Sequence, residues 1–111
     1  MTLLEKQQLF VSLIPKLINK ALEMGYQLTI GDAYRDPRVH GPIGVKMGYG
    51  DSNSNHKNRL AIDLNLFKDG QFLQTSEDHR SLGEYWESLG GAWGGRFHDG
   101  NHYSWEHEGM K

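Results

Sequence analysis

The apolar residues in the first quarter of the chain recur at the spacing of a helix. They are Phe10, Leu13, Ile14, Leu17, Ile18, Ala21 and Leu22. Thr2 and Glu5 have the spacing of a capping box, and Gly25 follows the last apolar position. Pro15 lies inside the pattern, where it removes a backbone donor. The pattern therefore predicts either one amphipathic helix or two short helices, the second capped by Ser12.

The apolar positions then change to the alternation of β-strands. Residues 26–33 read as a strand, and leucine and isoleucine alternate with other residues over 60–66. A strand that buried these apolar side chains would turn Asp63 to the opposite side. Asp69 and Gly70 predict a hairpin turn, which would fold this strand back on a short partner.

The second half of the chain predicts another helix and a last strand. The helix is expected from Ser76 to Gly90-Gly91, and the strand from His102 to Glu106. Residues 36–52 form a loop rich in glycine and proline. No Lys-Ser or Lys-Thr follows its segment 44–50, so this segment is not a phosphate loop. We expect it to form a flexible wall of a substrate groove. The pattern predicts an α+β fold, a small antiparallel sheet with helices packed on it, and residues 1–111 as a single domain.

Composition and charge exclude several classes of protein. The chain has 111 residues, no cysteine and a formal net charge of −2 at pH 7. Disulfides and thiolate metal sites are therefore excluded, and the interspersed charges give no basic footprint for nucleic acid. Residues 1–20 carry Glu5 and Lys6 and have no long apolar run. We expect no signal peptide, no membrane partner, synthesis in the cytoplasm, and a monomer.

Two histidines and one aspartate form a candidate metal site. Two imidazoles and a carboxylate suit Zn²⁺, and the set His56, Asp63 and His102 leaves a fourth position for a water that the metal can acidify. Asp99 could take the proton of that water and pass it to a leaving group. The turn at 99–101 is expected to bring Asp99 to the side of His102. This set predicts a hydrolytic zinc site rather than a structural one.

The other histidines and the tryptophans have simpler interpretations. Each candidate ligand taken alone is common by chance, and only their arrangement where loops meet strand ends favours a metal. The remaining histidines, His40, His79, His98 and His107, are assigned to solvent or surface hydrogen bonds. Trp86 and Trp93 are assigned to the core and its edge, whereas Trp105 fits either the core or a substrate wall.

Several segments resemble one family of peptidases. Residues 54–63 read Ser-Asn-His-Lys-Asn-Arg-Leu-Ala-Ile-Asp, which resembles the Ser-x-His-x-x-x-x-Ala-x-Asp motif of the zinc D-Ala-D-Ala carboxypeptidases and L-alanyl-D-glutamate endopeptidases. That family includes phage endolysins and vancomycin-resistance dipeptidases. Its acid-x-x-His-aromatic motif is similar to residues 99–103, its Tyr-Arg to Tyr34-Arg35, and its Trp-Gly-Gly to residues 93–95. The resemblance covers about residues 26–105.

The resemblance implies a role for each matched residue. Zinc would lie on His56, Asp63 and His102, with Asp99 as general base and acid. The fold would be that of the hedgehog and DD-peptidase relatives.

Substrate contacts are implied by the same resemblance. Arg35 would neutralise negative charge on the tetrahedral intermediate or hold a substrate carboxylate. Ser54 would bond the substrate or orient His56. Tyr34 and Trp105 complete the expected substrate contacts.

Three positions depart from the family pattern. Arg59 stands where many relatives have glycine, Asn101 where many have proline, and Ser104 where many have an acidic or amide residue. The base, Asp99, resembles the phage endopeptidase branch, whereas the dipeptidases use glutamate. We therefore expect a phage or prophage endolysin that is released through a holin pore and cleaves peptidoglycan stem peptides between L-Ala and D-Glu.

Three alternatives stay open at this point. The first is a D-alanyl-D-alanine carboxypeptidase, and the second is a zinc-bearing cell-wall-binding module without turnover, which an intact Asp99 argues against. The third is a histidine-metal nuclease, suggested only by Asn101, His102 and His107 and disfavoured by the acidic balance of the chain.

Overall fold

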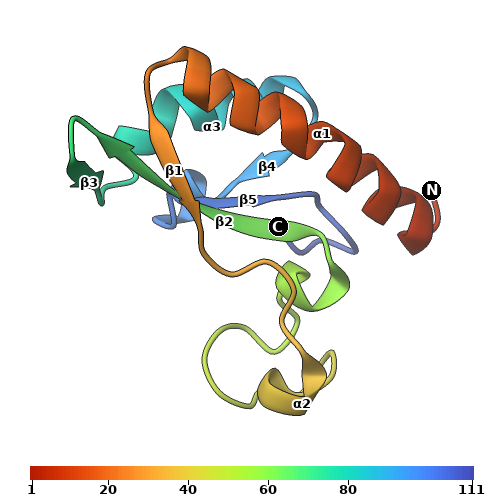
Figure 1. Ribbon diagram of the computed structural model, residues 1–111. Coiled ribbons are helices and arrows are strands. Elements are labelled where there is room, and N and C mark those ends of the chain that lie inside the picture. Colours follow the sequence, from red (N-terminus) through yellow and green to blue (C-terminus); the bar gives the residue numbers. More distant parts are fainter.

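The chain folds as helices packed on one open antiparallel sheet, as a computed structural model of all 111 residues shows (Figure 1). The strands are β1 (Gln27–Ile30), β2 (Ala61–Lys68), β3 (Gln71–Leu73), β4 (Ala92–Trp93) and β5 (His102–Ser104). The helices are α1 (Leu3–Glu23), the single turn α2 (Pro37–His40) and α3 (Arg80–Ser88). The strand order is β1-β2-β5-β4, and β3 also pairs with β2. The predicted α+β class is confirmed.

Helix α1 is continuous through Pro15, so the alternative of two short helices is wrong. The predicted capping box is present: Thr2 N–H donates to Glu5 Oε1 at 2.9 Å, and Glu5 N–H donates to Thr2 Oγ1 at 3.1 Å. Pro15 itself is exposed, whereas Phe10 and Leu17 on either side of it are buried in the core. Burial of one apolar stripe across the proline offsets the roughly 3 kcal/mol that an interior proline costs.

Strand β2 is the centre of the sheet. It pairs with β1 through Ile30 and Leu64, and with β5 in a register that sets Asp63 opposite His102. Leu64 and Leu66 are fully buried, whereas Asp63 is half-buried and lies toward the opposite face, as predicted. The sheet register therefore brings together two residues that are far apart in the chain.

The core joins both long helices to the sheet. Phe10 of α1 contacts Trp86 of α3 edge to face, with ring centroids 5.8 Å apart, and both pack with the leucines of β2. Trp86 and Trp93 are buried, which confirms their assignment to the core and its edge. The hairpin at Asp69-Gly70 is also confirmed, and both residues have positive φ, as a two-residue turn of this kind requires.

Some boundaries differ from the expected ones. The first strand spans only Gln27–Ile30, and the last strand ends at Ser104. The short elements α2 and β4 were not predicted, because four and two residues are too few to show a period. No helix of the chain combines the length and apolar character needed to cross a membrane.

Two of the histidines assigned to the surface are buried, so that assignment is wrong for His40 and His79. His79 is only 2% exposed, and its Nδ1 lies 2.8 Å from the Tyr103 hydroxyl. Burial lowers the pKa of His79 to about 4, because the charged imidazolium would lose its hydration. His98 is exposed as predicted, and His107 is half-buried with Nδ1 3.1 Å from Lys6 Nζ.

We expect His79 to make the stability of the fold depend on pH. Its pKa is lower in the folded protein than the ordinary value of about 6.5, so the unfolded chain binds the proton first. Stability should be complete above pH 6.5 and fall by up to about 3 kcal/mol as the pH decreases to about 4. Chemical denaturation in the presence of a chelator measures this loss. His79→Gln should flatten the pH profile in this window, and the exposed control His98→Gln should not; equal profiles for all three proteins would contradict the prediction.

Candidate metal centre

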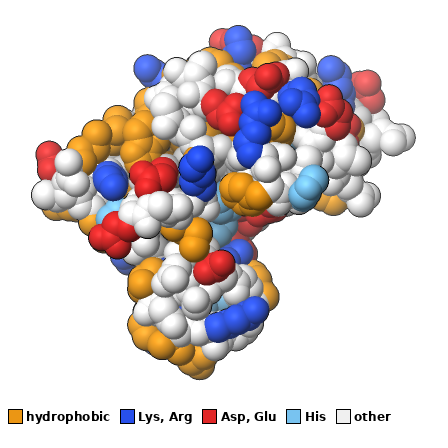
Figure 2. All heavy atoms as spheres, turned by 180° about the vertical axis from the view of Figure 1, so that it is seen from behind, with side chains coloured by type: hydrophobic (Ala, Val, Ile, Leu, Met, Phe, Trp, Pro, Cys, Tyr) orange, Lys and Arg blue, Asp and Glu red, His pale blue; other side chains and the backbone are white.

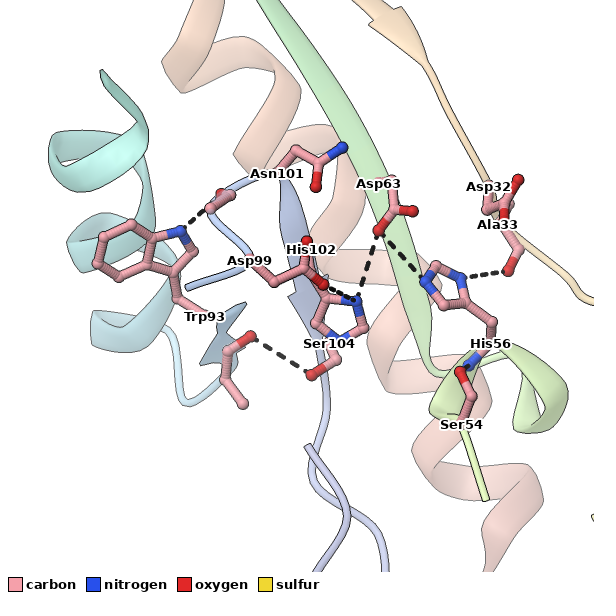
Figure 3. Close-up of polar contacts among 12 residues, drawn as sticks. Asp32, Ala33, Ser54, His56, Asp63, Trp93, Asp99, Asn101, His102 and Ser104 are labelled. Atoms are coloured by element: carbon pink, nitrogen blue, oxygen red, sulfur yellow. Dashed lines mark hydrogen bonds and ion pairs between the residues drawn. The ribbon is translucent and has the colours of Figure 1, made fainter. Parts of the chain in front are cut away.

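Three side chains from separate elements meet at one point beside the sheet (Figure 3). His56 lies in the 3₁₀ helix η1 (Asn55–Asn58), Asp63 in β2 and His102 in β5. Asp63 Oδ1 lies 3.2 Å from His56 Nε2 and 3.4 Å from His102 Nδ1. All the potential ligand atoms of this cluster lie within 4.8 Å of one another. The structure thus brings together the three residues that the sequence singled out.

The hydrogen bonds of His56 show which of its nitrogens is free for a metal. His56 Nδ1 lies 2.8 Å from the Ala33 carbonyl oxygen, so Nδ1 carries the proton and donates it. In this tautomer the lone pair of Nε2 points at Asp63 Oδ1, and both atoms are buried with no hydrogen-bond partner. Two facing lone pairs repel each other unless a cation lies between them.

The spacing of these atoms fits a tetrahedral zinc ion. Ligands at the usual 2.0–2.1 Å from zinc lie about 3.3 Å from one another in a tetrahedron. Two of the three separations, 3.2 and 3.4 Å, bracket that value, and all three lie within 4.8 Å. Zinc also accepts the donor set of two imidazoles and one carboxylate. The cluster is therefore positioned to bind a metal ion of this kind.

The charge of Asp63 agrees with a ligand role. Burial raises the pKa of this carboxyl, but hydrogen bonds and positive charge from His102 and His56, which these rings supply when they are protonated in the metal-free protein, lower it more, to about 2. Asp63 is therefore an anion at neutral pH. A buried anion between two imidazoles provides the negative charge that a divalent cation needs.

Local backbone geometry sets the position of His56. Ser54 caps η1, and its Oγ accepts the His56 N–H at 3.2 Å. Arg59 ends η1 in the left-handed conformation with φ of 57°, which explains why glycine is common here in the resembling family. The Arg59 guanidinium lies 4.0 Å from the ring centre of Tyr34, so the departure at this position is accommodated by a cation–π contact.

A tight turn sets the positions of His102 and Asp99. The buried Trp93 indole donates to the Gly100 carbonyl at 2.8 Å, and Asp99 N–H donates to the Gly94 carbonyl at 2.8 Å. At Gly94 a Cβ would lie 2.2 Å from the Asp99 carbonyl oxygen, so only glycine fits there. Asp99 Oδ2 lies 3.8 Å from His102 Nδ1, which confirms that the turn brings these side chains together (Figure 3).

The cluster of His56, Asp63 and His102 opens onto a cavity of about 380 Å³. Its lining includes His56 and His102, together with Arg35, Ser54 and Asp99. The Arg35 side chain is only 12% exposed; its Nε donates to Asp32 Oδ2 at 3.1 Å and its Nη1 to Ser54 Oγ at 3.2 Å. A fixed guanidinium and a half-exposed carboxylate thus share one cavity with the candidate ligands.

Not every residue expected at the site lies there. Tyr34 stacks on Arg59, and Trp105 packs against the core and Gly90, and neither lines this cavity. Their contact with a substrate stays a prediction. Ser104, a departure from the family pattern, is fully buried in β5.

Sequence reasoning missed other residues of the cavity. Phe97 lines it and packs on His102, with ring centroids 5.7 Å apart. Residues 109–111 line it as well, although they belong to no motif. Asp32 holds Arg35 from the end of β1. Of these residues, only Asp32 could have been found from the sequence, because it is an acid three residues before the basic Arg35 and could pair with it.

One family model matches the sequence. The family model described as D-alanyl-D-alanine carboxypeptidase matches residues 48–105, just over half of the chain. The matched range contains Ser54, the three candidate ligands and Asp99. No curated protein matches the sequence.

We expect one zinc ion per chain, bound by this cluster. His56→Ala and His102→Ala should each lose most of the bound metal, because two ligands do not hold zinc as three do. Elemental analysis after dialysis against a zinc buffer measures the ratio of metal to protein. His98→Ala, which changes an exposed histidine, is the control and should keep the full ratio. Stoichiometric zinc in either ligand variant would show that the ligand assignment is wrong.

Proposed function

Because the chain belongs to the D-alanyl-D-alanine carboxypeptidase family of zinc peptidases, which act on peptidoglycan, we propose that it is a zinc-dependent endopeptidase of peptidoglycan stem peptides. The bond cleaved would be that between L-Ala and D-Glu, and the biological role that of a phage or prophage endolysin. One observation supports this function above all. Two of the candidate ligands, His56 and His102, line the same cavity as Arg35 and Asp99.

The residues of the cavity divide the chemistry of amide hydrolysis among them. When bound, zinc would supply Lewis acidity to the scissile carbonyl and lower the pKa of water towards about 7. Asp99 Oδ2, at 3.8 Å from a ligand nitrogen, would accept the proton of the attacking water. The same carboxyl would then donate that proton to the amine leaving group. Asp99 would thus both accept and donate the one proton that is transferred.

Arg35 would stabilise negative charge on the substrate. Its Nε and Nη1 are held by Asp32 and Ser54, and Nη2 makes no hydrogen bond within the protein. A guanidinium held in this way offers its remaining N–H groups without further loss of rotamer freedom. It would bind either the developing oxyanion or a substrate carboxylate.

The surroundings of Asp99 favour an endopeptidase. A second cavity of about 260 Å³, lined in part by Asn65, Ser76 and Asn101, also includes Asp99. Two cavities therefore border the proposed acid and base. An endopeptidase needs such space because its substrate continues on both sides of the scissile bond, whereas removal of a terminal D-Ala does not require it.

Carboxypeptidase activity is the second candidate function. The matching family model is described by that activity, and the free edge of Arg35 is suited to the terminal carboxylate of a D-Ala-D-Ala peptide.

We expect Asp99→Asn to separate chemistry from metal binding. The variant should keep its zinc and its fold but lose about 10²–10⁴-fold in turnover, because the amide cannot accept the proton. Release of soluble fragments from purified peptidoglycan measures turnover. The matched control is Asp69→Asn, at the distant hairpin turn, where asparagine also tolerates positive φ. Equal activity of Asp99→Asn and the parent protein would contradict the catalytic role and favour a binding module.

The bond that is cleaved can be identified directly. Digestion of purified sacculi should create new amino termini on D-Glu, which mass spectrometry detects after the fragments are labelled. Release of free D-Ala with intact L-Ala-D-Glu bonds would instead establish the carboxypeptidase activity. A zinc-loaded protein that yields neither product would contradict both functions.

A further inference from the structure

The segment from Pro37 to Asn53, called the lobe here, projects from the body of the molecule (Figures 1 and 2). It contains α2 and the glycine-rich loop. Its apolar side chains are about half exposed or more: Val39, Ile43, Val45, Met47 and Tyr49. The lobe therefore has little hydrophobic core of its own, and polar contacts must hold it in place.

One ammonium group joins three segments of the lobe. Lys57 Nζ donates to the carbonyl oxygens of Pro42 at 3.2 Å, Val45 at 2.7 Å and Ser52 at 3.0 Å. These carbonyls come from the first half, the middle and the end of the lobe, and they use all three donors of the ammonium. Lys57 directly follows His56 in η1. The residue after a candidate metal ligand thus cross-links the lobe, together with backbone hydrogen bonds from Gly44 N–H to the Ser52 carbonyl at 2.8 Å and from Met47 N–H to the His40 carbonyl at 3.1 Å.

Tyr49 of the lobe contacts the residues that hold Arg35 at the candidate active site. The Tyr49 hydroxyl donates to Asp32 Oδ2 at 2.7 Å, and the same oxygen accepts from Arg35 Nε at 3.1 Å. The ring centre of Tyr49 lies 5.1 Å from Arg35 Cζ. At Gly50 a Cβ would lie 2.2 Å from Arg35 Nη1, so the lobe backbone also packs closely on the guanidinium.

We propose that Tyr49 and Lys57 are positioning residues for Arg35. Lys57 gives the lobe its shape, and the lobe presents the Tyr49 phenol that fixes Asp32 and, through it, the guanidinium. The proposal rests on the proposed function only in that Arg35 acts on the substrate. Its structural part, the control of Arg35 by the lobe, is testable without turnover.

The first test reads the Arg35 side chain directly by NMR. In the ¹⁵N-labelled, zinc-loaded protein, the Arg35 Nε–H signal should be resolved and should exchange slowly with water, because Asp32 accepts its proton. Tyr49→Phe and Lys57→Met should shift this signal and speed its exchange at least tenfold. Tyr85→Phe on α3 and Lys46→Met in the lobe are the matched controls, since neither side chain contacts Arg35 or its partners. An unchanged Arg35 signal in Tyr49→Phe would overturn the proposal, even if the protein cleaves no peptidoglycan.

The second test is a double-mutant cycle on a soluble stem peptide. Tyr49→Phe should lower kcat/KM about tenfold in the parent protein but less than twofold in the Arg35→Ala background, since its effect passes through Arg35. The loss in kcat/KM should divide between kcat and KM in the same way in Tyr49→Phe as in Arg35→Ala. An equal loss in both backgrounds would mean that the phenol acts independently of Arg35, and would overturn the proposal.

Chemical rescue tests the role of the Lys57 ammonium. In Lys57→Ala, methylammonium chloride should restore part of the lost kcat/KM by binding the same carbonyl oxygens, whereas sodium chloride at equal ionic strength should not. Full activity of Lys57→Ala without added amine would overturn the role of Lys57.

Discussion

A buried carboxylate oxygen faces two imidazole nitrogens, and the arrangement around it serves to keep these three atoms together. Asp63 Oδ1 has no hydrogen-bond donor of its own, and His56 Nε2 is equally unpaired in its neutral tautomer. With neither a metal ion nor a proton between them, each such buried group costs about 1–3 kcal/mol. A bound metal ion would relieve this cost, and for this reason we expect metal binding to be coupled to folding.

The cluster is held by backbone geometry rather than by side-chain packing alone. The pairing of β2 with β5 sets Asp63 opposite His102, and the Ala33 carbonyl sets the ring of His56. Glycines without room for a Cβ let the turn before β5 pack tightly, so that Trp93 can reach the Gly100 carbonyl. A backbone shift in any of these elements would therefore displace one ligand atom from the other two.

The short helix η1 connects the cluster to the rest of the molecule. His56 points to the cluster, and Lys57 points to the lobe. Buried Asn55 donates to the carbonyls of Trp105 at 3.0 Å and Met110 at 2.8 Å, which holds the last residues beside the cavity. The carbonyl of Asn58 accepts from Gln7 of α1 at 2.7 Å. Four consecutive residues thus link the cavity to four parts of the chain.

The sequence by itself determined the local structure and the ligand types. Capping at Thr2, alternation around Asp63 and the turn at Asp69-Gly70 depend on neighbours in the chain, and all appear in the structure. The chemistry of zinc limited its ligands to His, Asp or Glu in a chain without cysteine. Only the tertiary structure decided that His79 is buried and that the lobe reaches Arg35 through Tyr49. Burial and long-range hydrogen bonds depend on how distant segments pack, and no periodicity or short motif in the sequence records that packing.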